Sequence, residues 1–173
     1  MLIMICGQAS SGKSRYAESR LSELHGQPKI YIATSEVYDD EMRERVKVHQ
    51  AMREGKGFLT VERTRDLAEA DIPPGASVMI ESLTAWAANV MFADGGVMER
   101  GHVVMIVLED LRRLAWNVRD VVIVADDIFS DGGGYDALTE EYVRTLAELT
   151  VRIAAIADEV TEIISGMPLT CKP

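Results

Sequence analysis

Short apolar runs alternate with longer amphipathic segments along this chain. The run Leu2–Cys6 is apolar throughout and ends at Gly7, which is typical of a strand buried on both faces of a sheet. Amphipathic segments between such runs are typical of helices that flank a parallel sheet. The patterns predict strands at Leu2–Cys6, Lys29–Ala33, Phe58–Glu62, Ser77–Ile80, Val121–Ala125 and Val160–Ile164, and helices at Lys13–Leu24, Asp39–Arg53, Leu83–Ala93, Val97–Asn117 and Leu138–Ala157.

One of these assignments has an alternative. Within Val97–Asn117, the apolar run Val103–Val107 suits a strand as well as a helix. The chain has 173 residues, with neither an internal repeat nor a linker of biased composition. We therefore expect one α/β domain over residues 1–173, with a mostly parallel sheet flanked by helices.

The charge balance narrows the range of partners. Lys and Arg total 18 and Asp and Glu total 28, which gives a formal net charge of -10. Binding to nucleic acid or to an anionic membrane requires clustered positive charge, so we expect neither partner. Compact anions such as nucleotides remain possible, because backbone N–H groups, one lysine and a metal ion can hold them locally.

Targeting and cysteine signals are sparse. Cys6 and Cys171 lie at opposite ends of the sequence, in a spacing that suggests neither a zinc site nor a disulfide framework. The apolar start is too short for a signal peptide, and no apolar run approaches the roughly 20 residues of a membrane span. We expect a cytoplasmic protein without a membrane span.

The strongest motif follows the first predicted strand. The residues Gly7-Gln8-Ala9-Ser10-Ser11-Gly12-Lys13-Ser14 fit G-x-x-x-x-G-K-[ST], the phosphate-binding P-loop pattern, and a predicted helix follows them. In such a loop, glycines let successive N–H groups turn toward phosphate oxygens. Lys13 would reach the β- and γ-phosphates, and the Ser14 hydroxyl would bind Mg²⁺. The motif and its setting predict a P-loop NTPase fold of the RecA-like kind.

A second acidic group is needed near the metal ion, usually at the end of a neighbouring buried strand. Glu81 follows Ser77–Ile80, and Asp126 or Asp127 follows Val121–Ala125. We expect Glu81 to contact the metal or the ribose, with Asp126 or Asp127 as the alternative. Spacing alone does not separate metal coordination from a loop-capping role.

A polar stripe lies on the predicted helix Asp39–Arg53, where Glu41, Arg45, His49 and Arg53 recur every four residues. A solvent-exposed salt-bridge ladder would give the same spacing. The wider set of residues, however, resembles the adenosylcobinamide kinase/adenosylcobinamide-phosphate guanylyltransferase family of cobalamin assembly. The residues that carry the resemblance are Tyr31-Ile32-Ala33-Thr34-Ser35, Asp40-Glu41-Met42, Arg45, His49, Arg53, Phe58, Thr60, Glu62, Glu81-Ser82-Leu83-Thr84-Ala85-Trp86 and Asn89.

The resemblance implies two activities at one site. ATP or GTP would phosphorylate the aminopropanol hydroxyl of adenosylcobinamide, and GTP would then transfer GMP to that phosphate and release pyrophosphate. By position, His49 would be the catalytic nucleophile that carries GMP, and neutral imidazole suits that role. A homotrimer is also implied. The nucleotide contacts would fall on Gly7, Gln8, Ala9, Ser10, Ser11, Gly12, Lys13, Ser14, Ala33, Thr34, Ser35, Gln50, Ala51, Met52, Arg53, Glu62 and Glu81.

The chain departs from the family pattern in places. The family P-loop reads Gly-Gly-x-Arg-Ser-Gly-Lys-Ser, whereas this chain has Gln8 and Ser10. After the Val121–Ala125 strand the family has Asn-Glu-Val-Gly, and this chain has Asp126-Asp127-Ile128-Phe129. The late helix differs as well. Two further hypotheses therefore stay open: a kinase for another small alcohol, and a nucleotide-binding regulator or scaffold that has lost catalysis.

Overall fold

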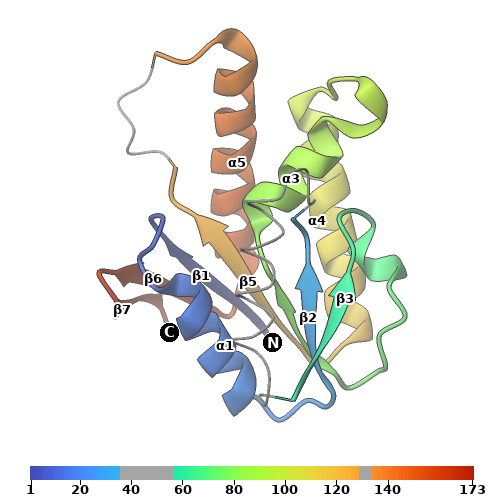
Figure 1. The fold of residues 1–173 in the computed structure, drawn as a ribbon, viewed down its shortest axis with the longest axis vertical. Helices are drawn as coiled ribbons and strands as arrows, with labels where there is room; N and C mark the ends of the chain where they lie inside the picture. Colours follow the sequence, from blue (N-terminus) through green and yellow to red (C-terminus); the bar gives the residue numbers. More distant parts are fainter. Residues whose placement is uncertain (36–56, 129–133) are drawn as a thin grey trace, which may run out of the picture.

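The computed structural model describes residues 1–35, 57–128 and 134–173. Its centre is a seven-stranded sheet in the order β3-β2-β4-β5-β1-β6-β7 (Figure 1). Every neighbouring pair is parallel except β6 and β7, which form an antiparallel hairpin. The strands are β1 (Leu2–Gly7), β2 (Lys29–Ala33), β3 (Phe58–Glu62), β4 (Ser77–Ile80), β5 (Asp120–Asp126), β6 (Glu159–Ile164) and β7 (Met167–Lys172).

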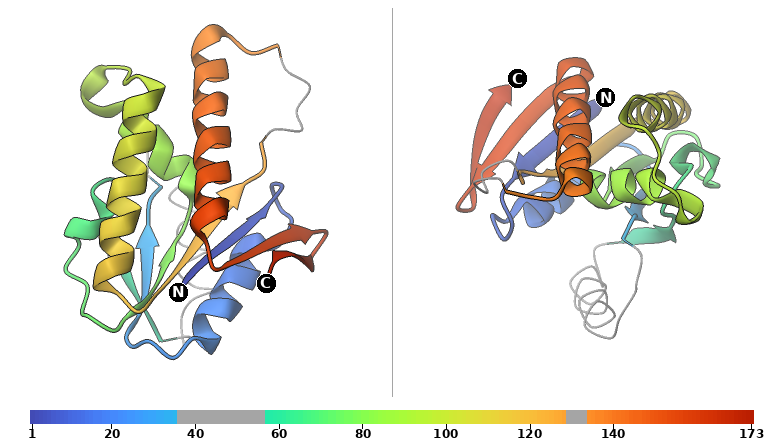
Figure 2. Two further views of the ribbon diagram at one scale, coloured as in Figure 1. Left: turned by 180° about the vertical axis from the view of Figure 1, so that it is seen from behind. Right: turned by 90° about the horizontal axis from the view of Figure 1, so that it is seen from above.

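Helices cover both faces of this sheet. The helix α1 (Lys13–Glu23) packs on one face, and α3 (Leu83–Met91), α4 (Arg100–Asn117) and α5 (Ala137–Ile156) pack on the other (Figure 2). Two short 3₁₀ turns, η1 (Leu67–Glu69) and η2 (Ala93–Gly95), complete the described elements. The predicted α/β fold with a mostly parallel sheet is confirmed.

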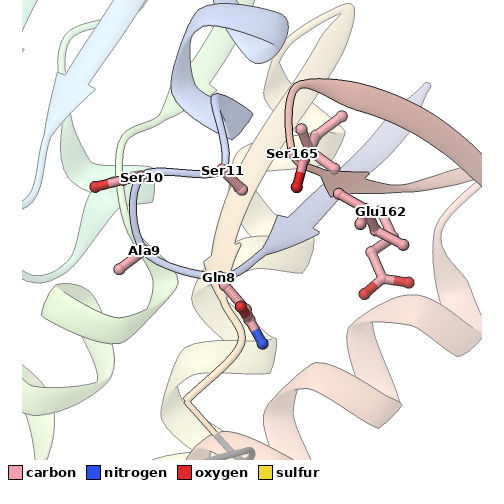
Figure 3. A pocket seen from close by; sticks show the side chains of 8 residues that line it. Gln8, Ala9, Ser10, Ser11, Glu162 and Ser165 are labelled. Carbon is pink, nitrogen blue, oxygen red and sulfur yellow. The ribbon is translucent and has the colours of Figure 1, made fainter.

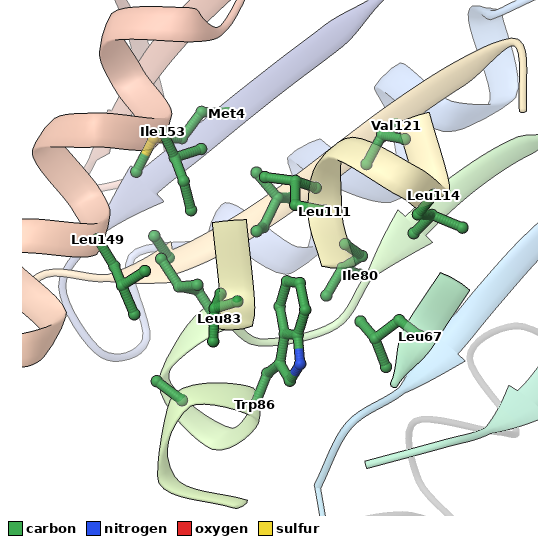
Figure 4. Close-up of a cluster of buried hydrophobic side chains, with 14 of the residues drawn as sticks. Met4, Leu67, Ile80, Leu83, Trp86, Leu111, Leu114, Val121, Leu149 and Ile153 are labelled. Carbon is green, nitrogen blue, oxygen red and sulfur yellow. The ribbon is translucent and has the colours of Figure 1, made fainter. Parts of the chain in front are cut away.

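The core follows from the strand periodicity of two. Alternate residues of β1 enter different clusters, with Met4 on the side of α3, α4 and α5 and Ile3 on the side of α1. The larger cluster surrounds Trp86, whose side chain is fully buried between α4 and the sheet (Figure 4). Because both faces are covered, the central strands are apolar at nearly every position, and this is the pattern that predicted them.

The predicted strands lie where expected, and the ambiguous segment is a helix. In α4 the buried residues Val103, Val107, Leu111 and Leu114 recur at helical spacing, whereas Met105 is exposed. The strand β7 was not predicted. Its residues are exposed apart from the half-buried Lys172, so it lacks the burial pattern that marks a strand. The predicted helix Asp39–Arg53 lies outside the described residues.

Candidate nucleotide-binding site

The P-loop joins β1 to α1, as the motif predicted. A Cβ on Gly7 would lie 2.6 Å from the carbonyl oxygen of Ile163 and 2.7 Å from Ser11 Oγ, so only glycine fits this close approach. Gly12 caps α1 with φ +92, a left-handed conformation that favours glycine. The loop therefore leads directly into the positive N-terminal end of α1, the geometry that binds phosphate.

Lys13 is held inside this loop. Its side chain is buried, and Nζ lies 2.7 Å from Asp126 Oδ1 and donates a hydrogen bond to the Gln8 carbonyl oxygen at 3.1 Å. Asp126 ends β5, and the parallel register pairs it with Gly7 of β1. The strand next to the P-loop strand thus supplies the carboxylate that faces Lys13. A bound phosphate would compete with this carboxylate for the ammonium group.

Glu81 lies one strand further away, because β5 separates β4 from β1. Its Oε1 accepts a hydrogen bond from the Tyr31 hydroxyl at 2.9 Å. Its Oε2 accepts two more, from the backbone N–H groups of Thr34 at 3.1 Å and Ser35 at 3.2 Å. In this structure, the carboxylate therefore fixes the exit of β2. The predicted contact between Glu81 and the metal or ribose stays a prediction.

Asn89 of α3 completes this polar network. Its Nδ2 donates to the carbonyl oxygens of Thr34 at 2.7 Å and Thr64 at 3.2 Å, which ties the segments after β2 and β3 together. The Thr34 hydroxyl donates to the Ser82 carbonyl oxygen at 3.0 Å, and Thr34 itself is fully buried. Sequence reasoning used Asn89 only as a matching letter and assigned it no role. Its amide reveals a role only once the fold brings two carbonyl groups to it.

The remaining predicted site residues fall into two groups along the carboxyl edge of the sheet. The register pairs Ala33 with Glu62, so these residues lie beside Thr34, Ser35 and Glu81 at the ends of β2, β3 and β4. Ser14, in the first turn of α1, belongs to the P-loop group. The predicted nucleophile His49 and the predicted contacts Gln50, Ala51, Met52 and Arg53 lie outside the described residues.

The fold and loop place this chain among the P-loop NTPases. A solved structure titled as a prototypical ATPase from the type III secretion system of pathogenic bacteria aligns with a TM-score of 0.54 and 16% identity, over 93% of this chain and 51% of that one. A second solved structure, titled as an ATPase domain, aligns with a TM-score of 0.52 and 13% identity, over 93% and 68%. At such identities the likeness shows the fold alone.

The family assignment comes from sequence comparison. The model of the cobinamide kinase / cobinamide phosphate guanyltransferase family matches residues 3–171, and the chain belongs to this family. The bifunctional adenosylcobalamin biosynthesis protein CobU of Salmonella typhimurium is 30% identical over 99% of this chain and 100% of that protein. The corresponding CobP of Pseudomonas aeruginosa is 30% identical over 98% and 96%. The predicted resemblance is confirmed.

A membrane-crossing helix was not expected from the sequence. Over residues 1–35, 57–128 and 134–173, no helix combines the length and apolar character that a bilayer span requires.

Proposed function

We propose that this protein phosphorylates the alcohol of adenosylcobinamide with a nucleoside triphosphate and then transfers GMP from GTP to the resulting phosphate. The observation that carries the proposal is the family match over residues 3–171 together with a fully formed P-loop. Both steps belong to assembly of the cobalamin nucleotide loop. The proposal makes the chain a kinase and a guanylyltransferase, as its relatives are named.

In the kinase step, the P-loop would bind the triphosphate through its backbone N–H groups and Lys13. Lys13 would exchange Asp126 for a phosphate oxygen, which leaves the Asp126 carboxylate facing the phosphates. Ser14, Glu81 and Asp126 carry the oxygen donors that Mg²⁺ prefers, so the residues present fit the ion. Ser14 and Glu81 are its predicted ligands, and Mg²⁺ would supply neutralisation of phosphate charge when bound.

In the transfer step, we propose that a neutral nitrogen of His49 attacks the α-phosphorus of GTP. A nitrogen–phosphorus bond forms, the bond to the bridging oxygen breaks, and pyrophosphate leaves with the electron pair. An oxygen of adenosylcobinamide phosphate then attacks the same phosphorus and displaces the histidine. Arg53 would stabilise negative charge on the group in transfer. This assignment of His49 and Arg53 rests on the resemblance.

The network around Glu81 would serve this second step. Glu81, Asn89 and Ser82 fix Thr34 and Ser35, two residues for which the resemblance implies nucleotide contacts. A binding segment whose backbone is held by side chains loses little further freedom when nucleotide binds. We therefore propose that the ends of β2, β3 and β4 form the GTP side of the site.

Product analysis tests both activities. The purified protein is incubated with adenosylcobinamide and Mg²⁺, with ATP or GTP, and the corrinoids are separated by chromatography. We expect adenosylcobinamide phosphate with either nucleotide, and the GDP-linked corrinoid with GTP alone. Turnover of a nucleoside triphosphate on a different small alcohol would favour the alternative kinase. Binding without turnover of either kind would favour a regulator or scaffold.

The resemblance also bears on assembly and location. We propose a homotrimer that acts in the cytoplasm, by similarity to the family. Sedimentation equilibrium of the purified protein would give three times the mass of 19.1 kDa for a trimer. A single chain mass over the working concentration range would contradict the trimer.

A further inference from the structure

A cavity of about 310 Å³ lies beside the P-loop, on the side away from β5 (Figure 3). It is lined by residues 8–11 of the P-loop and by residues 162–165, which end β6 and begin the turn into β7. Its volume lies at the lower end of the range of small-molecule pockets, about 300–1,000 Å³. The nucleotide contacts implied for Thr34, Ser35 and Glu81 lie on the opposite side of the P-loop, beyond β5.

The walls of this cavity are fixed and unusually shaped. The Gly166 N–H donates to the Ser11 carbonyl oxygen at 2.9 Å, so the β6–β7 turn is tied to the P-loop. Ser10 and Ser165 have φ values of 58° and 50°, a left-handed conformation that serine rarely adopts. Such strained residues cluster at ligand sites, because the surrounding structure must hold them in place.

One polar group in the cavity wall calls for a ligand. Ser11 is 8% exposed, and its Oγ has no hydrogen-bond partner within the described residues. A buried hydroxyl without a partner is costly, and a bound polar molecule would satisfy it. In Figure 3 the Ser165 and Ser11 side chains lie close to each other, and the Glu162 carboxylate points toward the Gln8 side. The cavity therefore offers hydroxyl, amide and carboxylate groups.

The position of the cavity indicates which part of a nucleotide it would take. Lys13 faces Asp126 of β5, so the β- and γ-phosphates that Lys13 binds would lie toward β5. The nucleoside end of the same molecule would then extend the other way, toward β6, which is the neighbour of β1 on that side. The cavity lies at that place and adjoins the loop that holds the phosphates.

We propose that this cavity binds the purine base of the nucleoside triphosphate used in the kinase step, and that Glu162 selects guanine over adenine. The inference rests on the proposed function and adds a base site to it. A carboxylate accepts hydrogen bonds only, and guanine offers it the N1–H and exocyclic N2–H donors on one edge. Adenine presents an unprotonated N1 acceptor at the same edge, which a carboxylate repels. The two activities would thus use bases bound on opposite sides of the P-loop.

Equilibrium binding tests this proposal. Wild type and Glu162→Gln are titrated calorimetrically, in the presence of Mg²⁺, with the α,β-methylene analogues of GTP and ATP, which resist transfer of the nucleotide. Lys13→Ala identifies the component of binding that belongs to the P-loop. For that component we expect the GTP analogue to bind wild type about tenfold more tightly than the ATP analogue. Glu162→Gln should bring the two affinities to within about twofold, mainly by weakening the GTP analogue.

Controls separate selection from a general disturbance. Glu109→Gln makes the same chemical change on the exposed face of α4 and should leave both affinities at the wild-type values. An equal loss for both analogues in Glu162→Gln, or an unchanged preference, would overturn the proposal, as would the absence of a preference in wild type. Binding that Lys13→Ala leaves intact would instead overturn the proposed P-loop function, and the base site with it.

Discussion

The two sides of the carboxyl edge are built in different ways. Around the P-loop, backbone conformation makes the site: a close approach at Gly7, a left-handed Gly12 and the first turn of α1. Around Glu81, side chains make it, through hydrogen bonds from Tyr31, Thr34 and Ser35 that span 46 to 50 positions of the sequence. The first kind of site is written in eight consecutive residues, whereas the second exists only once the sheet has formed.

The difference also concerns charge. Lys13 carries a buried positive charge that is paired with Asp126, and a phosphate must replace this partner. Glu81 receives its hydrogen bonds from a hydroxyl and two amides, which are neutral donors. We therefore expect substitutions on the P-loop side to change nucleotide binding most, and substitutions on the Glu81 side to change stability as well.

The largest effect should come from Lys13→Ala. Loss of the one ammonium group in the P-loop removes both the phosphate contact and the partner of Asp126, whose uncompensated charge then repels the triphosphate. We expect kcat/KM of the kinase reaction to fall at least about a hundredfold. Initial rates with adenosylcobinamide and ATP measure it. Arg112→Ala on the exposed face of α4 serves as the control and should keep the wild-type rate.

The next effect should come from Asn89→Ala, on the side-chain-built side. The substitution leaves the carbonyl oxygens of Thr34 and Thr64 without the amide that bonds them. The free energy of unfolding should fall by about 1–3 kcal/mol, as for a buried polar group that loses its partner. Urea unfolding at constant pH measures the change. Equal stability of the variant and wild type would show that this side does not depend on the network.

A smaller effect is expected for Asp126→Asn, which keeps the shape and removes the charge next to Lys13. Without Mg²⁺, the carboxylate repels an uncomplexed triphosphate, so the variant should bind metal-free ATP about tenfold more tightly than wild type, or about 1.4 kcal/mol. Fluorescence titration in the presence of EDTA tests this. Asp127→Asn also removes one charge but keeps the ion pair, and a gain of the same size there would assign the effect to net charge.

The smallest effect concerns pH. The Tyr142 hydroxyl donates to the Thr84 carbonyl oxygen at 2.8 Å, and burial raises the pKa of Tyr142 to about 12. An unfolded tyrosine ionises near pH 10. Between these values the unfolded chain binds fewer protons than the folded chain, so stability falls as pH rises. Below pH 10 this contribution is fully present.

Tyr142→Phe isolates this contribution. The variant should lose less stability than wild type between about pH 10 and pH 12, because one group that titrates on unfolding is absent. Thermal unfolding at matched pH values gives the comparison. Parallel curves for the two proteins would show that Tyr142 titrates alike in the folded and unfolded chains.

The sequence predicted most of the fold because most strands are buried on two faces. It missed β7, whose side chains are largely exposed, and left Val103–Val107 ambiguous until burial at helical spacing settled it. It located the P-loop, a local motif. It did not reveal the pair between Lys13 and Asp126, nor the hydrogen bonds that engage Glu81, because strand order and register create both.

The central claim is that GMP passes through His49 while the P-loop serves phosphoryl transfer. GTP labelled at the α-phosphate, with saturating Mg²⁺, tests it on wild type and His49→Ala. We predict that wild type acquires an acid-labile, alkali-stable label, that adenosylcobinamide phosphate removes it, and that His49→Ala acquires none. An unlabelled wild-type protein, or an equally labelled His49→Ala variant, would contradict the claim.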